Sequence, residues 1–197
     1  MLKDKLRGLN LILASSSPRR KLLLEGIDLD FNIEVDGDIP EDFDPLMDVQ
    51  IVPEYLAEIK STSFSRKLGY NEILITADTI VLCNNEILGK PKDREEAISM
   101  LIKLSGKKHL VLTGVFIRNN FKRRSFTVTT DVYFRDLSIE EIEYYVDKYH
   151  PYDKAGAYGA QEWIGYIAIS RIDGSYVNVM GLPVQRLYLE LDKFLTN

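Results

Sequence analysis

The sequence Leu11-Ile-Leu-Ala-Ser-Ser-Ser-Pro-Arg-Arg20 contains the local signals that decide how this chain begins to fold. Its first residues form an apolar run without polar alternation, which is typical of a strand buried on both faces. Ser17 is a favoured N-cap, and Pro18 is the residue type favoured at the first helical position. Gly26 is placed to end that helix. The stretch therefore predicts a buried strand that passes at once into a helix.

The charge of this predicted helix is unusual, because Arg19, Arg20 and Lys21 place three cations in its first turn. A helix N-terminus already carries about half a positive charge, so each exposed cation there costs roughly 0.3–1 kcal/mol. Backbone N–H groups, serine hydroxyls and guanidinium groups are also good ligands of phosphate. Two interpretations follow from this stretch alone: a site for an anion, or a solvated first turn that happens to be basic.

The composition is that of a globular α/β chain, with 197 residues, 45% hydrophobic content and a formal net charge of −5. This length allows one large domain, or one domain with a small lobe. No apolar run reaches the roughly 18 residues that a membrane span needs, and the N-terminus lacks the apolar core of a signal peptide. The acidic balance gives no global attraction to nucleic acid. We therefore expect neither membrane nor nucleic acid as a partner.

The cysteine and histidine content limits the chemistry further. Cys83 is the one cysteine, which excludes an intrachain disulfide and fits a reducing cytoplasm. The two histidines, His109 and His150, leave little for a His-rich metal site or a serine–histidine triad. If the chain is an enzyme, carboxylates, lysines and arginines are expected to carry its chemistry.

Asp78 lies in the middle of a near-continuous apolar and β-branched run from Ile73 to Leu82, which predicts a central strand. Burying an isolated carboxylate is expensive, so such a residue is expected to be hydrogen-bonded, paired or coordinated to a cation. A structural capping role, a metal-ligand role and a general-base role are all compatible with this position. Thr79 would face the opposite side of an ideal strand.

Two lysines are candidates for phosphate contact. Lys90 lies between Gly89 and Pro91 on a constrained loop, with no Walker-type glycine run before it, so the loop is not a P-loop. Lys60 lies in a helix predicted from Pro53 to about Leu68, where it is either a phosphate ligand or a solvated helix lysine.

Four other segments have two interpretations each. Residues 153–162 are rich in glycine and alanine, which favours either a close approach of the backbone to a ligand or a tight connecting loop. Residues 118–124 form the basic tip of a predicted hairpin, which either binds nucleic acid or is simply a charged turn, and no aromatic platform supports the first. Residues 163–169 are either a strand or an apolar packing segment. The acidic loop from Asp36 to Pro53 is either solvated or presents a carboxylate to a metal-bound phosphate.

These pieces together resemble the Maf family, the septum-formation-inhibitor-like nucleotide pyrophosphatases. The resemblance covers essentially the whole chain, and although each motif alone is weak, the ordered set is highly specific. The matching pieces are Ala14-Ser-Ser-Ser-Pro-Arg-Arg20, the helix with Leu56, Ala57 and Lys60, Ala77-Asp-Thr79, Gly89-Lys-Pro91, Leu104-Ser-Gly106, Thr113-Gly114, Asp153-Lys-Ala-Gly-Ala-Tyr-Gly-Ala-Gln161, Gly174-Ser175 to Asn178, and Gly181-Leu-Pro183.

The resemblance implies an α/β, Maf/ITPase-like fold in which an elongated mixed β-sheet is flanked by helices. The active site would lie in a cleft between two lobes, and residues 1–197 would form a single domain. It also implies hydrolysis of a nucleoside triphosphate to the monophosphate and pyrophosphate, supported by a divalent cation such as Mg²⁺, Mn²⁺ or Co²⁺. Such an enzyme removes non-standard or surplus pyrimidine triphosphates.

The resemblance further assigns residue roles. Asp78 would be the proton acceptor that activates water, and Ser15, Arg19, Arg20, Lys60 and Lys90 would line the phosphates. Asp78 would also hold the metal, together with Asp38 or Glu41, between which the sequence does not decide. Of two sister subfamilies, the one that acts on dTTP and UTP has arginine, threonine and glutamine at three motif positions, which here are Arg19, Thr79 and Gln161. The one that acts on 7-methyl-GTP typically has tryptophan, glutamine and glutamate there.

A second function from a different class is a nucleotide-binding regulator of cell division and septum formation that acts through a protein partner. The intact set of Asp78, Lys90, Arg19 and Gln161 argues against a purely degenerate binder. Modified uridine triphosphates are further candidate substrates of the enzyme. Dimerisation is common in the family, and a homodimer is therefore a candidate assembly.

Overall fold

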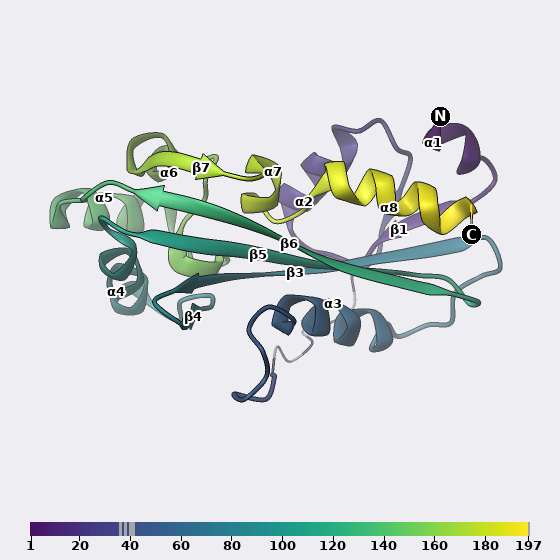
Figure 1. The fold of residues 1–197 in the computed structure, drawn as a ribbon, viewed down its shortest axis with the longest axis horizontal. Coiled ribbons are helices and arrows are strands. Elements are labelled where there is room, and N and C mark those ends of the chain that lie inside the picture. The colour runs from purple at the N-terminus through teal and green to yellow at the C-terminus, as the bar shows by residue number, and fades with distance from the viewer. Residues whose placement is uncertain (36, 38, 40–41, 197) are drawn as a thin grey trace. The chain divides into compact units, whose positions relative to one another are not determined.

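The computed structural model describes residues 1–35, 37, 39 and 42–196, and Figure 1 shows how their helices and strands are arranged. The elements in chain order are α1 (Leu2–Lys5), β1 (Asn10–Leu13), α2 (Pro18–Glu25), β2 (Asn32–Ile33), α3 (Val52–Thr62), β3 (Glu72–Cys83), β4 (Glu86–Leu88), α4 (Arg94–Leu104), β5 (Lys108–Arg118), β6 (Arg123–Phe134), α5 (Ile139–Tyr149), η1 (Ala155–Ala157), α6 (Trp163–Ala168), β7 (Ile169–Asp173), α7 (Tyr176–Val179) and α8 (Val184–Thr196).

The strands form one seven-stranded sheet with the order β2-β1-β3-β5-β6-β7, and β4 pairs with β3 away from this path. β1 is parallel to both β2 and β3, whereas β4 is antiparallel to β3. The sheet is therefore mixed, and helices flank it, so the predicted α/β class is confirmed.

The first strand and helix form as the sequence predicts. Leu11, Ile12 and Leu13 are buried in β1, which pairs in parallel with β3. The side chain of Ser17 accepts a hydrogen bond from the backbone N–H of Arg20, and Gly26 is the C-cap of α2. No acidic side chain lies in the first turn of α2, so its basic start is retained in the fold.

The chain divides into two compact units. Unit 1 comprises Met1–Asp78, Thr113–Val128 and Gly181–Asn197, and unit 2 comprises Thr79–Leu112 and Thr129–Met180. The predictions of one domain over residues 1–197 and of a cleft between two lobes stay predictions.

In unit 1, helices cover both faces of the sheet. Strand β6 has Ser125 and Thr127 on one face, and both hydroxyls donate to the carboxylate of Glu54 in α3. The alternate residue Arg124 instead donates to Glu190 in α8. Because neighbouring strand residues point to opposite faces, α3 and α8 lie on opposite sides of β6, as Figure 1 shows.

Helix α3 is shorter than predicted, because it ends at Thr62 rather than near Leu68. The guanidinium of Arg118 donates to the backbone carbonyl of Ser61 at 2.8 Å and to its hydroxyl at 2.9 Å. The hydroxyl of Thr62 donates back to carbonyls one turn earlier. The carbonyl of Ser61, which also accepts from the backbone N–H of Phe64, thus gains a side-chain donor from a strand more than fifty residues away.

Unit 2 has its own core, in which α4, α5 and α6 pack against β3 to β6. Ser138 and Glu141 form a complete capping box at the start of α5. Residues 163–168 are a helix, α6, so the strand interpretation of this segment is wrong. Gly165 lets this helix pack closely against the segment before it, since a Cβ there would lie 2.0 Å from the carbonyl oxygen of Ala160.

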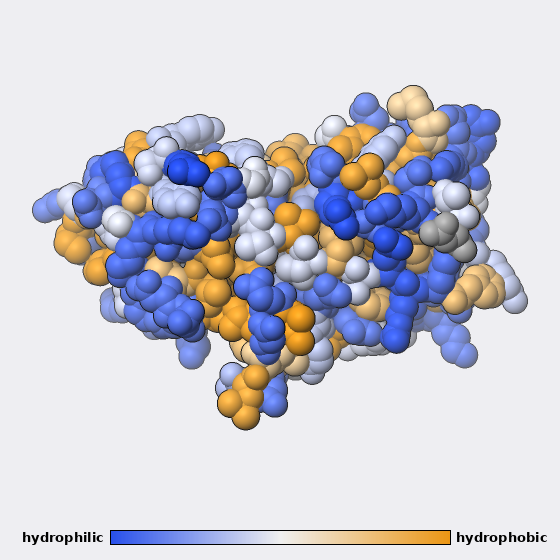
Figure 2. Space-filling view, viewed as in Figure 1, coloured by the Kyte–Doolittle hydropathy of each residue, from blue (hydrophilic) through white to orange (hydrophobic). Residues whose placement is uncertain are grey.

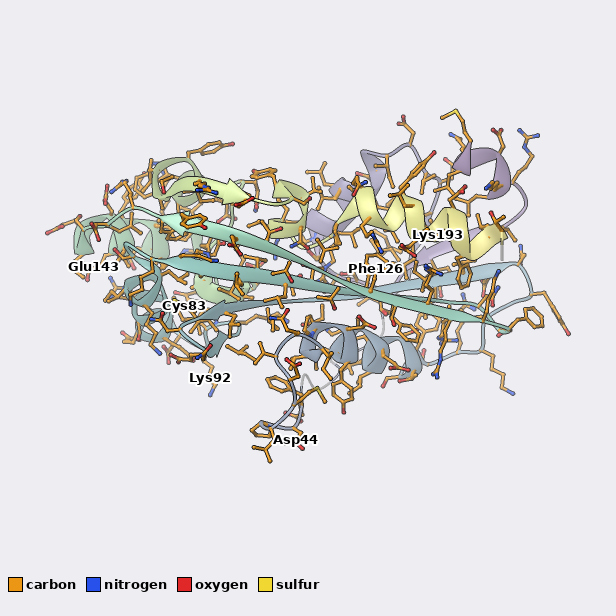
Figure 3. The ribbon with its side chains drawn as sticks, viewed as in Figure 1. Asp44, Cys83, Lys92, Phe126, Glu143 and Lys193 are labelled. Atoms are coloured by element: carbon orange, nitrogen blue, oxygen red, sulfur yellow. The ribbon has the colours of Figure 1, made fainter. Side chains whose placement is uncertain are left out.

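Glu190 is a buried acid on α8 that the sequence analysis did not single out. It is 1% exposed, and three cations surround it. Arg186 and Lys193 each approach its carboxylate to 3.0 Å, and Arg124 donates to it from β6; Figure 3 labels Lys193 on α8 and Phe126 on β6. Burial raises the pKa of the Glu190 carboxyl, but hydrogen bonds from Lys193 and Arg124 outweigh this and hold its pKa below 4.5.

We expect Glu190→Gln to lower the free energy of unfolding at neutral pH by about 1–3 kcal/mol, discounted to that range because the cations are partly exposed. The folded-state pKa lies below the unfolded value, so the stabilisation is present above pH 4.5 and is lost as the pH falls below it. Urea unfolding of both proteins between pH 7 and pH 3 measures this. Glu143→Gln, at an exposed acid labelled in Figure 3, is the control. A difference between wild type and Glu190→Gln that stays constant with pH would contradict the expectation.

The basic tip of the β5–β6 hairpin is engaged by the protein itself. Arg118 contacts Ser61, Arg123 contacts Glu58 at 3.1 Å, and Lys122 lies 4.8 Å over the ring of Phe194. These contacts favour the interpretation of a charged turn over a nucleic-acid surface.

The face in Figure 2 is mainly hydrophilic, with apolar residues distributed between the polar ones. Across the described residues, no helix has the length and hydrophobicity to cross a membrane.

Candidate functional site

Ser15 and Arg20 meet just beyond the carboxyl end of β1. Ser15 is nearly buried, and its hydroxyl oxygen accepts from the backbone N–H of Ser17 at 3.3 Å and from Nη1 of Arg20 at 3.4 Å. Nε of Arg20 donates to the carbonyl of Gly181 at 2.8 Å. The guanidinium is therefore held in place by two protein oxygens, and it fixes the serine in turn.

Asp78 and Lys60 form an ion pair. Asp78 is 5% exposed on β3, and the ammonium of Lys60 on α3 donates to its Oδ1. Two residues earlier on the same face of β3, the hydroxyl of Thr76 donates to the carbonyl of Ala57 at 2.6 Å. Thr76 and Asp78 are two residues apart and share one face of β3, and Ala57 and Lys60 are about one turn apart on α3. The two contacts therefore align Lys60 with Asp78. Of the three expected states of Asp78, hydrogen-bonded, paired or coordinated to a cation, the structure shows a hydrogen-bonded ion pair.

The two groups lie on adjacent parallel strands. Leu13 pairs with Ile75, and the next residue, Ala14, donates its N–H to the carbonyl of Ile75 at 2.9 Å. Ser15 therefore follows β1 beside the segment of β3 that leads to Asp78. The carboxyl ends of parallel strands are where α/β sheets commonly bind ligands, so unit 1 places a carboxylate, a hydroxyl and cations at such an edge.

In unit 2, the loops that contain Lys90 and Gln161 are joined through their backbones. The N–H of Gly156 donates to the carbonyl of Gly89 at 3.0 Å, immediately before Lys90. Gly156 has a φ of 68°, a conformation that favours glycine. Its missing Cβ would also lie 3.0 Å from a methyl group of Val81. At Gly156 the backbone thus packs against the protein's own β3 and Lys90 loop, which agrees with the interpretation of a tight connecting loop at this residue.

Gln161 has an orphaned acceptor. Within the part of the chain that the structure describes, its Oε1 is buried and has no hydrogen-bond partner. Leaving a buried acceptor without a hydrogen bond costs about 1–3 kcal/mol. An acceptor of this kind is expected at a binding site, because a bound ligand can supply the missing donor.

The remaining predicted residues stand as follows. Arg19 is the neighbour of Arg20 in the first turn of α2 and belongs to unit 1. Thr79 follows Asp78 directly on β3 and belongs to unit 2, as does Lys90. Asp38 and Glu41, the alternatives for a second metal ligand, lie outside the described residues.

His109 is a core residue rather than a site residue. It is 1% exposed, its Nε2 lies 2.8 Å from the hydroxyl of Tyr158, and the ring of Phe134 meets it edge-on. Burial lowers the pKa of His109 to about 4, so it is neutral at physiological pH. This agrees with the expectation that histidine does not carry the chemistry.

Tyr145 is a residue that the sequence analysis missed. It is fully buried on α5, and its hydroxyl bonds to Glu162 and to the backbone of Gly159, on either side of Gln161. The available signal was its place on the buried face of an amphipathic helix with Ile142 and Val146, because a buried tyrosine hydroxyl usually has a partner.

An open pocket of about 530 Å³ lies on unit 1, lined by residues 64–68, 70, 118, 120 and 121. Tyr70 precedes β3, whereas Asp78 lies six residues into that strand, roughly 20 Å further on. The arginines of the pocket already have partners, since Arg66 contacts Glu34 and Glu72 and Arg118 contacts Ser61. We assign this pocket no part in the candidate site.

The fold and the unit 1 geometry define an α/β protein with a polar, cation-rich site suited to a phosphate-bearing ligand. The chain belongs to the Maf family, because the family model described as Maf-like protein matches residues 10–194.

The relatives are similar along nearly their whole length. A Porphyromonas gingivalis protein named dTTP/UTP pyrophosphatase is 51% identical over 193 residues, which cover 97% of each chain. A Parabacteroides distasonis protein of the same name is 49% identical and covers 97% of this chain and 99% of its own.

Two solved structures are more distantly similar. A nucleoside-triphosphatase (dITP/XTP pyrophosphatase) from Mycobacterium abscessus has a TM-score of 0.44 and 8% identity, covering 95% of this chain and 99% of its own. A HAM1 protein from Coxiella burnetii has a TM-score of 0.43 and 12% identity, covering 64% of this chain and 73% of its own.

Proposed function

We propose that this protein is a nucleoside triphosphate pyrophosphatase that hydrolyses dTTP and UTP to the monophosphate and pyrophosphate. The observation that carries the proposal is about 50% identity, over nearly the whole chain, to proteins named dTTP/UTP pyrophosphatase. No observation favours the alternative of a regulator without turnover. Modified pyrimidine triphosphates are substrates of the same class and would use the same site.

In the proposed reaction, water attacks the α-phosphorus and the bond to the α–β bridging oxygen breaks. Pyrophosphate leaves with the electron pair of that bond, and the attacking water loses a proton to Asp78. Asp78 suits this role because it is a buried carboxylate in β3, just beyond the segment that pairs with the carboxyl end of β1, and it is ion-paired with Lys60. No covalent nucleophile is needed, because charge neutralisation on the leaving group supplies much of the catalysis.

Ser15, Arg20, Lys60 and Lys90 are the proposed phosphate ligands. The Ser15 oxygen accepts from Arg20 and from the backbone of Ser17, which leaves its hydrogen to donate to a phosphate oxygen. Arg20 is tied to Gly181 and Ser15, so it orients the serine. Arg19 projects about 100° round the helix from Arg20 and is the proposed contact of the substrate itself.

The donor set also fits a divalent cation, in the manner usual for Mg²⁺. Such ions are commonly held by one or two carboxylates together with substrate phosphates, and no cluster of three ligating side chains occurs among the described residues. Asp78, together with Asp38 or Glu41, would hold the cation. When bound, Mg²⁺, Mn²⁺ or Co²⁺ neutralises charge on the phosphates and lowers the pKa of water.

Gln161 is the proposed reader of the base, with Thr79 and Arg19 as the other specificity positions. The N3–H group of uracil or thymine is a donor and its neighbouring carbonyls are acceptors, which match the oxygen and the nitrogen of a glutamine amide. The orphaned Oε1 of Gln161 supports this assignment. Cytosine has an acceptor at N3, so it would leave that oxygen unsatisfied.

The proposal is tested by incubating the purified protein with a panel of nucleoside triphosphates and Mg²⁺, Mn²⁺ or Co²⁺ and separating the products. The expected result is monophosphate and pyrophosphate from UTP and dTTP, with CTP cleaved more slowly. Orthophosphate as the direct product, or no turnover of any pyrimidine triphosphate, would overturn it.

Gln161→Glu is expected to lower kcat/KM for UTP by about 10- to 100-fold, the equivalent of one or two lost hydrogen bonds to a buried group. A carboxylate retains an acceptor for N3–H but has no donor for the base carbonyl. It also matches the two donors on the edge of guanine, so relative activity on guanine nucleotides is expected to rise. The panel measures both changes, with Gln185→Glu on the exposed side of α8 as the control. A uniform loss for every nucleotide would count against base reading.

A cytoplasmic location and a homodimer complete the proposal. The single cysteine, Cys83, is buried and free, which suits a reducing compartment.

A further inference from the structure

The hydroxyl of Tyr145 contacts both Gly159 and Glu162, the first and last residues of the turn that contains Gln161. It donates to the carboxylate of Glu162 and accepts from the backbone N–H of Gly159 at 3.1 Å. The side chain is fully buried on α5, and its ring stacks on that of Tyr149 with centroids 5.1 Å apart. A rigid helix therefore supports the turn from inside the core of unit 2.

A buried lysine, Lys154, also forms an ion pair with Glu162. Lys154 is 7% exposed, and its ammonium lies 3.1 Å from Glu162 and 2.7 Å from Asp153. Buried ionised groups require such partners, because water no longer solvates them. Glu162 thus receives donors from α5 and from the loop before η1, which fix the position of its carboxylate.

The backbone of this loop requires restraint. Ala157 has a φ of 57°, a left-handed conformation that costs a residue other than glycine roughly 1–2 kcal/mol. At Gly159 a Cβ would lie 2.8 Å from Cδ of Glu162 and 2.9 Å from Nε2 of Gln161. Both side chains therefore fold back over the glycine. Conformations of this kind persist where the surroundings over-determine them, often at ligand sites.

The geometry points to Tyr145 as a positioning residue for base selection, acting on Gln161 through Glu162 and Gly159. This inference rests on the proposed function. Its hydrogen bonds attach both sides of the 159–162 turn to α5, and Gln161 is the residue between them whose acceptor is unsatisfied. Loss of the hydroxyl leaves the turn free to shift, and the orphaned oxygen then no longer meets N3–H at a fixed place.

Tyr145→Phe removes only the hydroxyl. The expected result is a fall of about fivefold to tenfold in the ratio of kcat/KM for UTP to that for CTP, the size of one neutral hydrogen bond. The loss is expected in KM for UTP, with kcat at saturating UTP nearly unchanged. Tyr149→Phe, on the same helix and stacked on the same ring, is the matched control and is expected to retain the wild-type ratio.

A double-mutant cycle distinguishes the positioning of Gln161 by Tyr145 from a general loss of stability. In a Gln161→Ala background, Tyr145→Phe is expected to leave the UTP/CTP ratio unchanged, because the residue through which it acts is gone. If Tyr145→Phe unfolds, Glu162→Gln removes the charged half of the same link, and the same fall in ratio is expected.

The outcomes are distinguishable. An active, UTP-selective wild type whose ratio survives both Tyr145→Phe and Glu162→Gln overturns this inference and leaves the proposed function standing. An equal fall of the ratio in the Gln161→Ala background also overturns it, because the effect would not pass through Gln161. A wild type that cleaves no nucleoside triphosphate overturns both.

Discussion

Asp78→Asn is expected to lower kcat for UTP hydrolysis by about 10²–10⁴-fold, the range typical for loss of a general base. This corresponds to roughly 3–5 kcal/mol of transition-state stabilisation. The asparagine retains the size of the side chain and can still contact Lys60, whereas it cannot accept the proton of water. Initial rates of pyrophosphate release over a range of UTP concentrations measure the effect.

Two further measurements make the Asp78 result specific. Asp192→Asn, at a partly exposed ion pair on α8, is the matched control and is expected to retain wild-type activity. Thermal unfolding shows whether Asp78→Asn remains folded at the assay temperature, since it alters a buried pair. A folded Asp78→Asn variant with at least one tenth of the wild-type kcat would contradict the assignment of Asp78 as the proton acceptor.

Gly114→Ala is expected to destabilise the protein by about 3 kcal/mol, at the upper end of the cost of overpacking. Gly114 lies in β5, and a Cβ there would be 2.2 Å from the carbonyl carbon of Pro53 and 2.3 Å from the backbone nitrogen of Glu54. The sheet and the first turn of α3 therefore touch backbone to backbone. A backbone cannot rotate away from the clash as a side chain can, so α3 must move.

Urea unfolding compares Gly114→Ala with Gly26→Ala. At Gly26 the added Cβ would meet a carbonyl at 3.4 Å, an ordinary contact, and its φ of −65° suits alanine. Gly26→Ala is expected to change the free energy of unfolding by less than about 1 kcal/mol. The fraction of Gly114→Ala that stays folded is also expected to lose activity, because α3 places Lys60 beside Asp78. A stability equal to that of wild type would show that β5 and α3 are less tightly packed than described.

Much of the fold could be predicted because its signals are local. Ser17 and Pro18 start α2 through hydrogen-bond and φ preferences that act within one turn, and the Ser138–Glu141 capping box starts α5 in the same way. The apolar run around Asp78 predicts a buried strand, and a buried carboxylate has to be paired. Asn84 and Asn85, which join β3 to β4, both have positive φ, as a type I′ hairpin turn requires and as asparagine tolerates.

The parts that could not be predicted depend on distant residues. Arg118, at the end of β5, donates to the last turn of α3, and Gly165 in α6 packs against the backbone of Ala160 with no room for a Cβ. Glu190 interrupts the apolar stripe of α8 because cations on two elements surround it.

The sequence alone determined that this chain is a Maf-family α/β protein with a basic helix start and a carboxylate on a core strand. The tertiary structure decided which groups act on one another: Lys60 pairs with Asp78, Gly181 anchors Arg20, and Tyr145 supports the turn around Gln161. The physical reason is the distance along the chain over which each kind of interaction acts. Capping, turn and hydrophobic-periodicity signals act over a few residues, whereas these partners are 14 to 161 residues apart and meet only when the sheet and its helices have packed.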